Sequence, residues 1–184
     1  MKIIIISDIH GITTNLNKIY DIFVKEQFDY LAVLGDIYYG NSKNKNYDPI
    51  KVQKFLSAFK NRLICLKGNC DLTVDINNLS IKNDDIQLYQ IPNTNIYLSH
   101  GHKYNEFNWH KDNTILITGH THIPKISTDN SNLYICPGSI STSRSTTKES
   151  YLIYDNDTFT IYDINDNIID KTKKIYWKNF LKEA

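Results

Sequence analysis

The sequence contains no long apolar run and no excess of charge of either sign. Its 184 residues include 21 Lys and Arg and 20 Asp and Glu, which gives a net charge of +1. A chain this neutral has no overall attraction for nucleic acid or for a membrane, so an anion must be bound by a local site. A membrane-spanning helix needs about 20 apolar residues. The apolar start of the chain ends at Ser7, too early for a secretory signal. We therefore expect no membrane segment and no nucleic-acid partner.

Cysteine is also scarce, with Cys65, Cys70 and Cys136 the only three in the chain. An odd number without a C-x-x-C pair argues against a disulfide framework and against a thiolate zinc site. We therefore expect a reduced, cytoplasmic protein. The length suits one domain, and 41% hydrophobic with 22% charged residues is an ordinary globular balance. The sequence thus predicts a single domain over residues 1–184.

The apolar pattern predicts an α/β fold. Short β-branched runs end at Asp8, Asp36 and Gly68, and apolar residues recur at helical spacing between them. This alternation predicts right-handed βαβ units on a parallel sheet. After Asp71, short runs at hairpin spacing predict a mixed or antiparallel sheet. These later strands are expected over residues 86–91, 96–99, 114–118, 133–135, 151–154 and 158–164. The Lys-rich tail, 171–182, is expected to be a solvated strand end or a short helix.

Each apolar run ends in a short polar signature, and five of the six histidines lie in these signatures. Ligands bind at the carboxyl ends of strands in open α/β sheets. Glycine beside the polar residues lets the backbone turn sharply and approach a ligand closely. The signatures are Asp8-Ile9-His10-Gly11, Gly35-Asp36, Gly68-Asn69-Cys70-Asp71, Ser99-His100-Gly101-His102 and Gly119-His120-Thr121-His122.

The residue types in these signatures suit a pair of divalent metals. Carboxylates, imidazoles and an amide oxygen form a mixed N/O donor set, which favours Mn, Fe, Zn or Ni over Ca or Mg. Asp8 and His10 are two residues apart, as are His120 and His122, so each pair shares a face in extended chain. Taken alone, each signature has an ordinary explanation as a turn, and Asn69 as a helix cap. Together, in this order and at strand ends, they predict a metal centre.

The ordered motifs resemble those of the calcineurin-like metallophosphoesterase superfamily, and within it the small bacterial and archaeal phosphodiesterases of the YfcE type. The resemblance extends from the first strand to Ile164 and includes Pro137-Gly138-Ser139. It implies a four-layer α/β/β/α sandwich of two mixed sheets flanked by helices. It also implies a hydrolase that attacks small phosphodiesters with a water or hydroxide activated by a dinuclear metal site.

The resemblance assigns roles to individual residues. It implies two divalent ions, with Mn²⁺ first and Fe, Ni or Zn as alternatives. The first metal would be held by Asp8, His10 and His122, the second by Asn69, His100 and His120, with Asp36 bridging the two. The expected catalytic residues are Asn69, Cys70, Asp71 and His100. The expected substrate contacts are Asn69, His102, Lys43 and Lys45.

Two of these assignments have competing explanations. Cys70 stands where most members of the superfamily have a histidine that protonates the leaving group, although cysteine is usual in the YfcE-type branch. A thiol with a pKa of about 8.5 could donate a proton, but two adjacent cations would favour the thiolate. Lys43 and Lys45 lie in the loop 41–47, where they either attract a phosphate or are simply solvated.

Three other functions remain open on the sequence. A catalytically silent, protein-binding scaffold of this fold, like the retromer subunit of the superfamily, has altered ligand residues, whereas this ligand set is complete. A DNA nuclease of the superfamily carries capping segments and a basic surface, for which this chain has neither length nor charge. A phosphomonoesterase is compatible with the motifs. The sequence also leaves open whether the chain forms a dimer or a tetramer.

Overall fold

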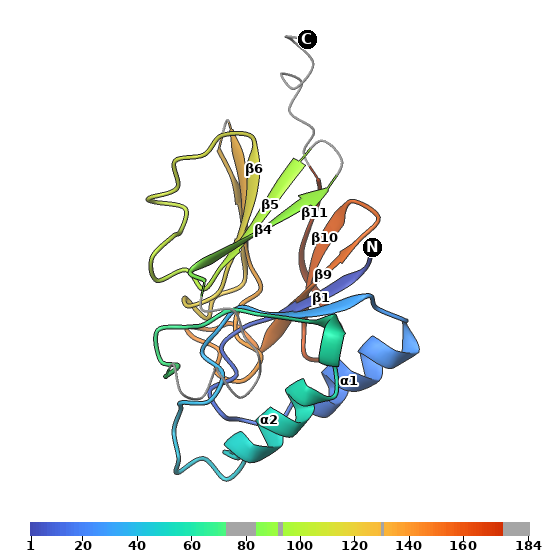
Figure 1. Ribbon diagram of the computed structural model, residues 1–184, viewed down its shortest axis with the longest axis vertical. Helices are drawn as coiled ribbons and strands as arrows, with labels where there is room; N and C mark the ends of the chain where they lie inside the picture. Colours follow the sequence, from blue (N-terminus) through green and yellow to red (C-terminus); the bar gives the residue numbers. More distant parts are fainter. Residues whose placement is uncertain (73–83, 92–93, 130, 175–184) are drawn as a thin grey trace.

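The computed structural model describes residues 1–72, 84–91, 94–129 and 131–174, which form two sheets (Figure 1). The six-stranded sheet has the order β11-β10-β9-β1-β2-β3, and the five-stranded sheet the order β4-β5-β6-β8-β7. The strands of the first sheet are β1 (Ile3–Ile6), β2 (Tyr30–Val33), β3 (Leu63–Cys65), β9 (Ser150–Asp155), β10 (Thr158–Asp163) and β11 (Ile168–Lys173). Those of the second are β4 (Ile86–Ile91), β5 (Thr94–Ser99), β6 (Thr114–Thr118), β7 (Lys125–Thr128) and β8 (Asn132–Cys136).

Both sheets are mixed. In the first, β1, β2 and β3 pair in parallel, while β9 pairs with β1 in the antiparallel sense. In the second, β5, β6 and β8 pair in parallel, with antiparallel β4 and β7 at the two edges. Because parallel neighbours share their carboxyl ends, residues that follow β1 and β2 emerge at one edge, as do those that follow β5 and β6.

Alternation along β1 shows why the sheets pack as they do. Ile4 and Ile6 face the helices, whereas Ile3 and Ile5 face the five-stranded sheet. Because successive strand residues point to opposite faces, one run of four isoleucines serves two apolar layers. The helices α1 (Leu16–Lys25) and α2 (Pro49–Ser57) cover the outer side of the six-stranded sheet (Figure 1).

The predicted fold class, a single α/β domain built on two packed mixed sheets, is confirmed. Of the two outer helix layers in the expected four-layer α/β/β/α sandwich, the described residues form one. Within the described residues, both α-helices lie on the six-stranded sheet. The outer face of the five-stranded sheet is covered there by the loop 101–113, in which Trp109 packs against Tyr97 at 4.9 Å between ring centroids. No helix among the described residues is long and apolar enough to span a membrane.

The turn between β10 and β11 is organised by one carboxylate. Oδ1 of Asp163 accepts from the amides of Asn165 (2.8 Å) and Asn167 (2.9 Å). Its Oδ2 accepts from the ammonium group of Lys148 at 2.9 Å. The side-chain amide of Asn167, followed by Lys148 and the backbone amides, holds the pKa of Asp163 well below its usual range. The carboxylate is therefore more stable in the folded chain than in the unfolded one.

We expect Asp163→Ala to lower the melting temperature at pH 7 more than at pH 3. A carboxyl with a depressed pKa contributes stability above its unfolded pKa of about 3.9, and this contribution is lost as the pH falls toward the folded value. Thermal melts of both proteins at the two pH values measure the difference. Asp170→Ala, at an exposed position of β11, is the matched control. A loss that is equal at both pH values would contradict the proposed ionic contribution.

Candidate metal centre

Four of the polar signatures follow strands that end at one edge, where the two sheets come together. β1 leads into Asp8 and β2 into Asp36, while β5 leads into His100 and β6 into His120. The amide of His120 donates to Oδ2 of Asp8 over 3.0 Å. This hydrogen bond joins the two sheets directly beside the candidate ligands.

The first ligand cluster contains Asp8, His10 and His122, whose ligand atoms all lie within 4.8 Å of one another. The Nε2 atoms of His10 and His122 are 3.2 Å apart. Oδ1 of Asp8 lies 3.3 Å from Nε2 of His122 and 3.9 Å from Nε2 of His10. The fold thus brings together the three residues that the resemblance groups around one metal.

The second cluster contains Asp36, His100 and His120, again within 4.8 Å. Asn69 lies beside it, with Oδ1 2.9 Å from Nε2 of His100. Oδ2 of Asp36 is 3.4 Å from Nε2 of His100 and 3.7 Å from Nε2 of His10, which belongs to the first cluster. One carboxylate oxygen therefore lies between the two clusters, as a bridging ligand would.

Backbone carbonyls fix three of the imidazole rings. In each, Nδ1 lies within hydrogen-bond distance of a carbonyl oxygen, which can only accept, so Nδ1 carries the proton. The neutral ring then directs the lone pair of Nε2 into the cluster, as metal-binding histidines do. The contacts are His10 with Tyr39 (2.5 Å), His100 with Leu34 (2.6 Å) and His122 with Thr142 (2.5 Å).

The first cluster has the chemistry of a cation site. Asp8 is completely buried, and its Oδ1 faces the imidazole of His122 at 3.3 Å without a hydrogen-bond partner among the described residues. Burying an unpaired carboxylate oxygen is costly, and the Nε2 atoms of two imidazoles meet 3.2 Å apart beside it. A divalent cation would satisfy all three atoms. The residues present therefore fit a metal, and their mixed N/O donors suit Mn, Fe, Zn or Ni.

Electrostatics within the two clusters support the same conclusion. Burial disfavours the charged form of His100, but the hydrogen bond and negative charge of Asp36 outweigh burial and raise the pKa of His100. Burial would likewise raise the pKa of Asp36, but His100 outweighs it and holds that pKa well below its usual range. For His122, Asp8 overcomes the effect of burial and raises the pKa. Asp8 and Asp36 therefore favour positive charge at this place, which a bound cation would supply in place of the imidazole protons.

Five of the candidate ligands have a left-handed backbone. Their φ angles are 56° (Asp8), 51° (His10), 52° (Asp36), 67° (His120) and 62° (His122). For residues other than glycine this conformation is uncommon and costs about 1–3 kcal/mol each. Such strain persists only where the surrounding structure enforces it, and it concentrates at functional sites.

Residues 1–158 match the family model of the calcineurin-like phosphoesterase superfamily domain. The chain belongs to this superfamily. Phosphodiesterase YfcE of Escherichia coli K12 is 29% identical over 175 residues, which cover 92% of this chain and 95% of that protein. The solved structure of YfcE, a phosphoesterase from E. coli, has a TM-score of 0.88 at 28% identity and covers 94% of this chain and 99% of its own.

The fold is also shared with Vps29 of Entamoeba histolytica, solved in complex with Zn²⁺. Its TM-score is 0.62 at 19% identity, covering 94% of this chain and 99% of that one, and at this identity the likeness shows the fold alone. The family match and the likeness to YfcE confirm the predicted superfamily and the predicted enzyme class, a metallophosphoesterase.

Within this superfamily site, Cys70 lies beside the bridging position. Its Sγ forms a third group with ligand atoms of His10 and Asp36, again within 4.8 Å. Its amide donates to Oδ1 of Asp36 at 2.8 Å. Burial, followed by the negative charge of Asp36, raises the pKa of Cys70 to about 11. The protein's own groups therefore keep this thiol protonated.

Asp71 is buried and holds two parts of the site together. Its Oδ1 accepts from the amides of Ile37 (2.7 Å) and Tyr38 (3.4 Å), and its Oδ2 from the amide of Gly68 (2.9 Å). The carboxylate thus joins the segment after Asp36 to the loop that carries Asn69. The ligand groups found among the described residues do not include Asp71, and a positioning role accounts for its contacts.

Of the predicted substrate contacts, His102 lies next to the second cluster, whereas Lys43 and Lys45 lie in an exposed loop. The ring of His102 lies 5.4 Å from that of His100 and 6.3 Å from that of His120, so it borders the second cluster. Lys43 and Lys45 are exposed in a loop that begins close to Tyr39, whose carbonyl contacts His10. Contact of these three side chains with a substrate remains a prediction.

Sequence reasoning missed the support beneath the first cluster. Oγ of Ser139 donates to the carbonyl of Asp8 at 2.8 Å and accepts from the amide of Thr142 at 2.9 Å. Thr142 in turn supplies the carbonyl that fixes His122. The run Pro137-Gly138-Ser139 was a signal for Ser139. Thr142 gave none, although its Oγ1 also lies 3.0 Å from Nδ1 of His122.

We expect Gly68→Ala to disrupt the centre without unfolding the protein. A Cβ atom at this position would lie 2.1 Å from Oδ1 and 2.2 Å from the amide nitrogen of Asp36, so the bridging carboxylate would have to move. Metal content by elemental analysis should fall, while circular dichroism stays close to wild type. Leu72→Ala, at an exposed position of the same loop, is the control. Full metal loading of Gly68→Ala would show that Asp36 need not lie where the structure has it.

Proposed function

We propose that the chain hydrolyses small phosphodiesters at a centre of two divalent metal ions. The observation that carries this proposal is the position of Asp36 Oδ2, 3.7 Å from His10 Nε2 and 3.4 Å from His100 Nε2. A carboxylate shared by two clusters is the arrangement that a dinuclear centre needs. Preference for diesters is supported by the likeness to YfcE, which is named a phosphodiesterase.

The metal ions would be held by two sets of residues that meet at Asp36. The first set is Asp8, His10 and His122, and the second is Asn69, His100 and His120. When bound, the ions would supply Lewis-acid activation of a water and stabilise the charge on the phosphate. The donor set suits Mn, Fe, Zn or Ni, and the resemblance to YfcE-type enzymes puts Mn²⁺ first.

The chain's own residues orient the ligands and the substrate. Leu34, Tyr39 and Thr142 hold the three imidazole rings through their carbonyls. Asn69 and His102 border the second cluster, from which they would contact phosphate oxygens. Lys43 and Lys45 would attract the anionic substrate from the neighbouring loop.

A scaffold role is the main alternative, since Vps29 proteins share this fold. The complete ligand set favours hydrolysis, because a binding surface alone does not need seven converging metal-ligand side chains.

Three free cysteines suit the reducing cytoplasm, where we place the enzyme.

Asp36→Asn should be the most damaging conservative change at the centre, because it removes charge from the shared ligand. Removing a group that only hydrogen-bonds to a metal ligand typically lowers activity by roughly 10–100-fold. The loss in kcat/KM of Asp36→Asn should be larger than this. Hydrolysis of bis(p-nitrophenyl) phosphate with Mn²⁺ measures it, and metal analysis should find two ions per wild-type chain. Asp21→Asn, on the exposed face of α1, is the control. Activity of Asp36→Asn near that of wild type would rule out the bridging role.

Cys70→Ser should leave hydrolysis of aryl diesters within about tenfold of wild type, under ~1.4 kcal/mol of barrier. A nitrophenolate leaving group hardly needs a proton, whereas an alkoxide does. Cys70→His should therefore gain most on diesters with poor leaving groups, since imidazole is the better acid near neutral pH. If Cys70→Ser hydrolyses aryl diesters several orders of magnitude more slowly while both metals stay bound, Cys70 is essential and this prediction is wrong.

A further inference from the structure

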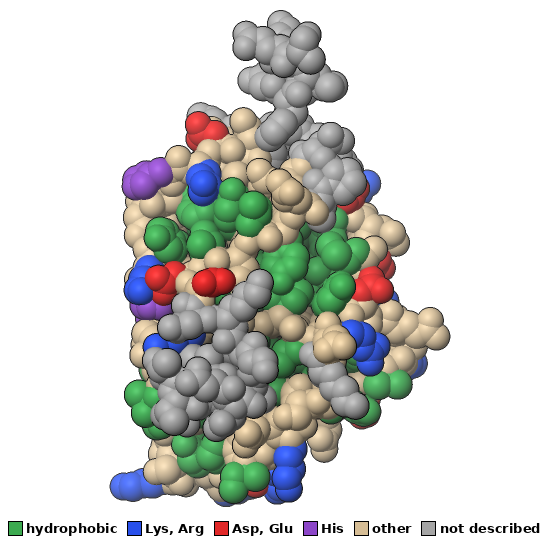
Figure 2. Space-filling view, in the orientation of Figure 1, with side chains coloured by type: hydrophobic (Ala, Val, Ile, Leu, Met, Phe, Trp, Pro, Cys, Tyr) green, Lys and Arg blue, Asp and Glu red, His purple; other side chains and the backbone are tan. Residues whose placement is uncertain are grey.

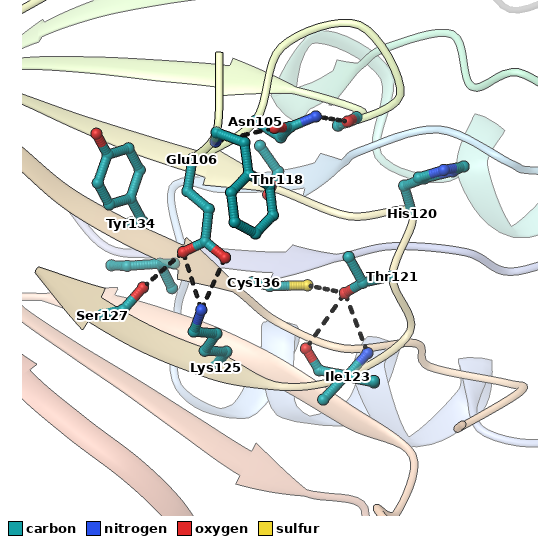
Figure 3. Close-up of a pocket in the computed structure, with 13 residues that line it drawn as sticks. Asn105, Glu106, Thr118, His120, Thr121, Ile123, Lys125, Ser127, Tyr134 and Cys136 are labelled. Carbon is teal, nitrogen blue, oxygen red and sulfur yellow. Dashed lines mark hydrogen bonds and ion pairs between the residues drawn. The ribbon is translucent and has the colours of Figure 1, made fainter. Parts of the chain in front are cut away.

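The outer face of the five-stranded sheet carries a pocket of about 240 Å³ (Figure 3). Its floor includes Tyr134 and Cys136 on β8, and Lys125 on β7 forms part of one side. The loop that follows β5 closes it, with Gly101 and Phe107 among the lining residues. Pockets for drug-sized ligands measure roughly 300–1,000 Å³, so this one suits a single ring system.

The pocket adjoins the metal centre. His120 lines the pocket and also supplies a ligand atom to the second cluster. Figure 3 shows the imidazole of His120 pointing away from Thr121, Glu106 and Lys125, so its backbone separates the pocket from the metal-facing ring. Gly101 directly follows His100 and lines the same wall. The pocket and the second cluster therefore lie on the two sides of one residue, His120.

The charged groups in the pocket neutralise each other. The carboxylate of Glu106 accepts from the ammonium group of Lys125 at 2.7 and 2.9 Å, and from Oγ of Ser127 at 3.0 Å (Figure 3). Burial raises the pKa of Cys136 to about 11, so its thiol is neutral. The space between these residues therefore offers no unpaired charge to an ionic ligand, and it favours an apolar group.

An exposed aromatic ring stands at the pocket's rim. Phe107 is 90% exposed, more than any other large hydrophobic side chain of the described residues. Its loop is held in place, because the amide of Phe107 donates to Oδ1 of Asn105 (3.0 Å), and Nδ2 of Asn105 donates to the carbonyl of Gly101 (3.2 Å). A ring presented to solvent on a fixed loop is free to stack on a ligand ring. In the space-filling view, other hydrophobic side chains gather in the upper and central parts of the face that is shown (Figure 2).

We propose that this pocket binds an aromatic group of the phosphodiester, one of its two esterified alcohols, while the phosphate is held at the metal centre. The preferred substrates are then diesters in which one alcohol carries a single aromatic or heteroaromatic ring, which stacks on Phe107. The proposal rests on the proposed function, since it takes the metal centre as the phosphate site.

Binding of two phosphonates to the Mn²⁺-loaded protein tests the pocket without requiring turnover. Benzylphosphonate differs from methylphosphonate only by a phenyl ring on the methyl carbon, so both share the same anchoring group. We expect benzylphosphonate to bind at least about tenfold more tightly in calorimetry, because the ring leaves water for an apolar pocket. Equal affinities in the wild-type protein would overturn the proposal.

Two variants locate the ring. Phe107→Ala removes the exposed side chain, and Ser127→Trp fills the pocket from β7. Each should bring the ratio of the two affinities toward one, with the affinity for methylphosphonate unchanged. Tyr104→Ala is the matched control, because Tyr104 is an exposed aromatic residue of the same loop that does not line the pocket. A ratio that Phe107→Ala and Ser127→Trp leave unchanged would place the ring elsewhere and overturn the proposal.

The same measurements separate this proposal from the proposed function. If benzylphosphonate binds as expected but no phosphodiester is hydrolysed, the pocket stands and the hydrolytic function fails. If diesters are hydrolysed and the two phosphonates bind equally, the function stands and the pocket proposal fails.

Discussion

The carboxylate of Asp36 is the constraint on which the rest of the centre depends. Its Oδ2 lies within 4 Å of imidazoles from both clusters, and its Oδ1 is held by the amide of Cys70. The side chain can occupy this place only because Gly68 has no Cβ. The carboxylate of Asp71 then accepts from the amides of Ile37 and Gly68, so it links the segment that follows Asp36 to the same loop. Strand β2, the loop after β3 and both clusters are thus adjusted to one acidic group.

Much of this arrangement could be predicted because chemistry and topology coincide at strand ends. Parallel strands deliver whatever follows them to one edge, so Asp8 and Asp36 could be placed together from their positions alone. His100 follows β5 of the other sheet and was grouped with them by the family resemblance. The strands predicted over 86–91 and 158–164 match β4 and β10 closely, because turn residues mark where their apolar runs end.

Other parts gave no usable signal. β7 and β11 are edge strands whose side chains are half-buried or exposed, so no alternation marked them. The expected strand end at 171 falls within β11, and residues 175–182 of the predicted tail lie outside the described residues. The carbonyls of Leu34, Tyr39 and Thr142 were invisible because every residue has one. The pocket beside His120 draws its walls from three strands and two loops, which only the fold brings together.

The left-handed backbone at five ligand positions restricts which amino acids can ever occupy them. Aspartate and histidine, with asparagine and glycine, are the residues that accept this conformation at lowest cost. Glutamate could also bind a metal but lacks their tolerance for the turn, and β-branched residues are excluded almost entirely. In a related protein that no longer binds metals, the same backbone conformation would still favour these few residue types at the five positions. In this fold, aspartate and histidine at Asp8 or His122 therefore record the shape of the chain as well as its chemistry.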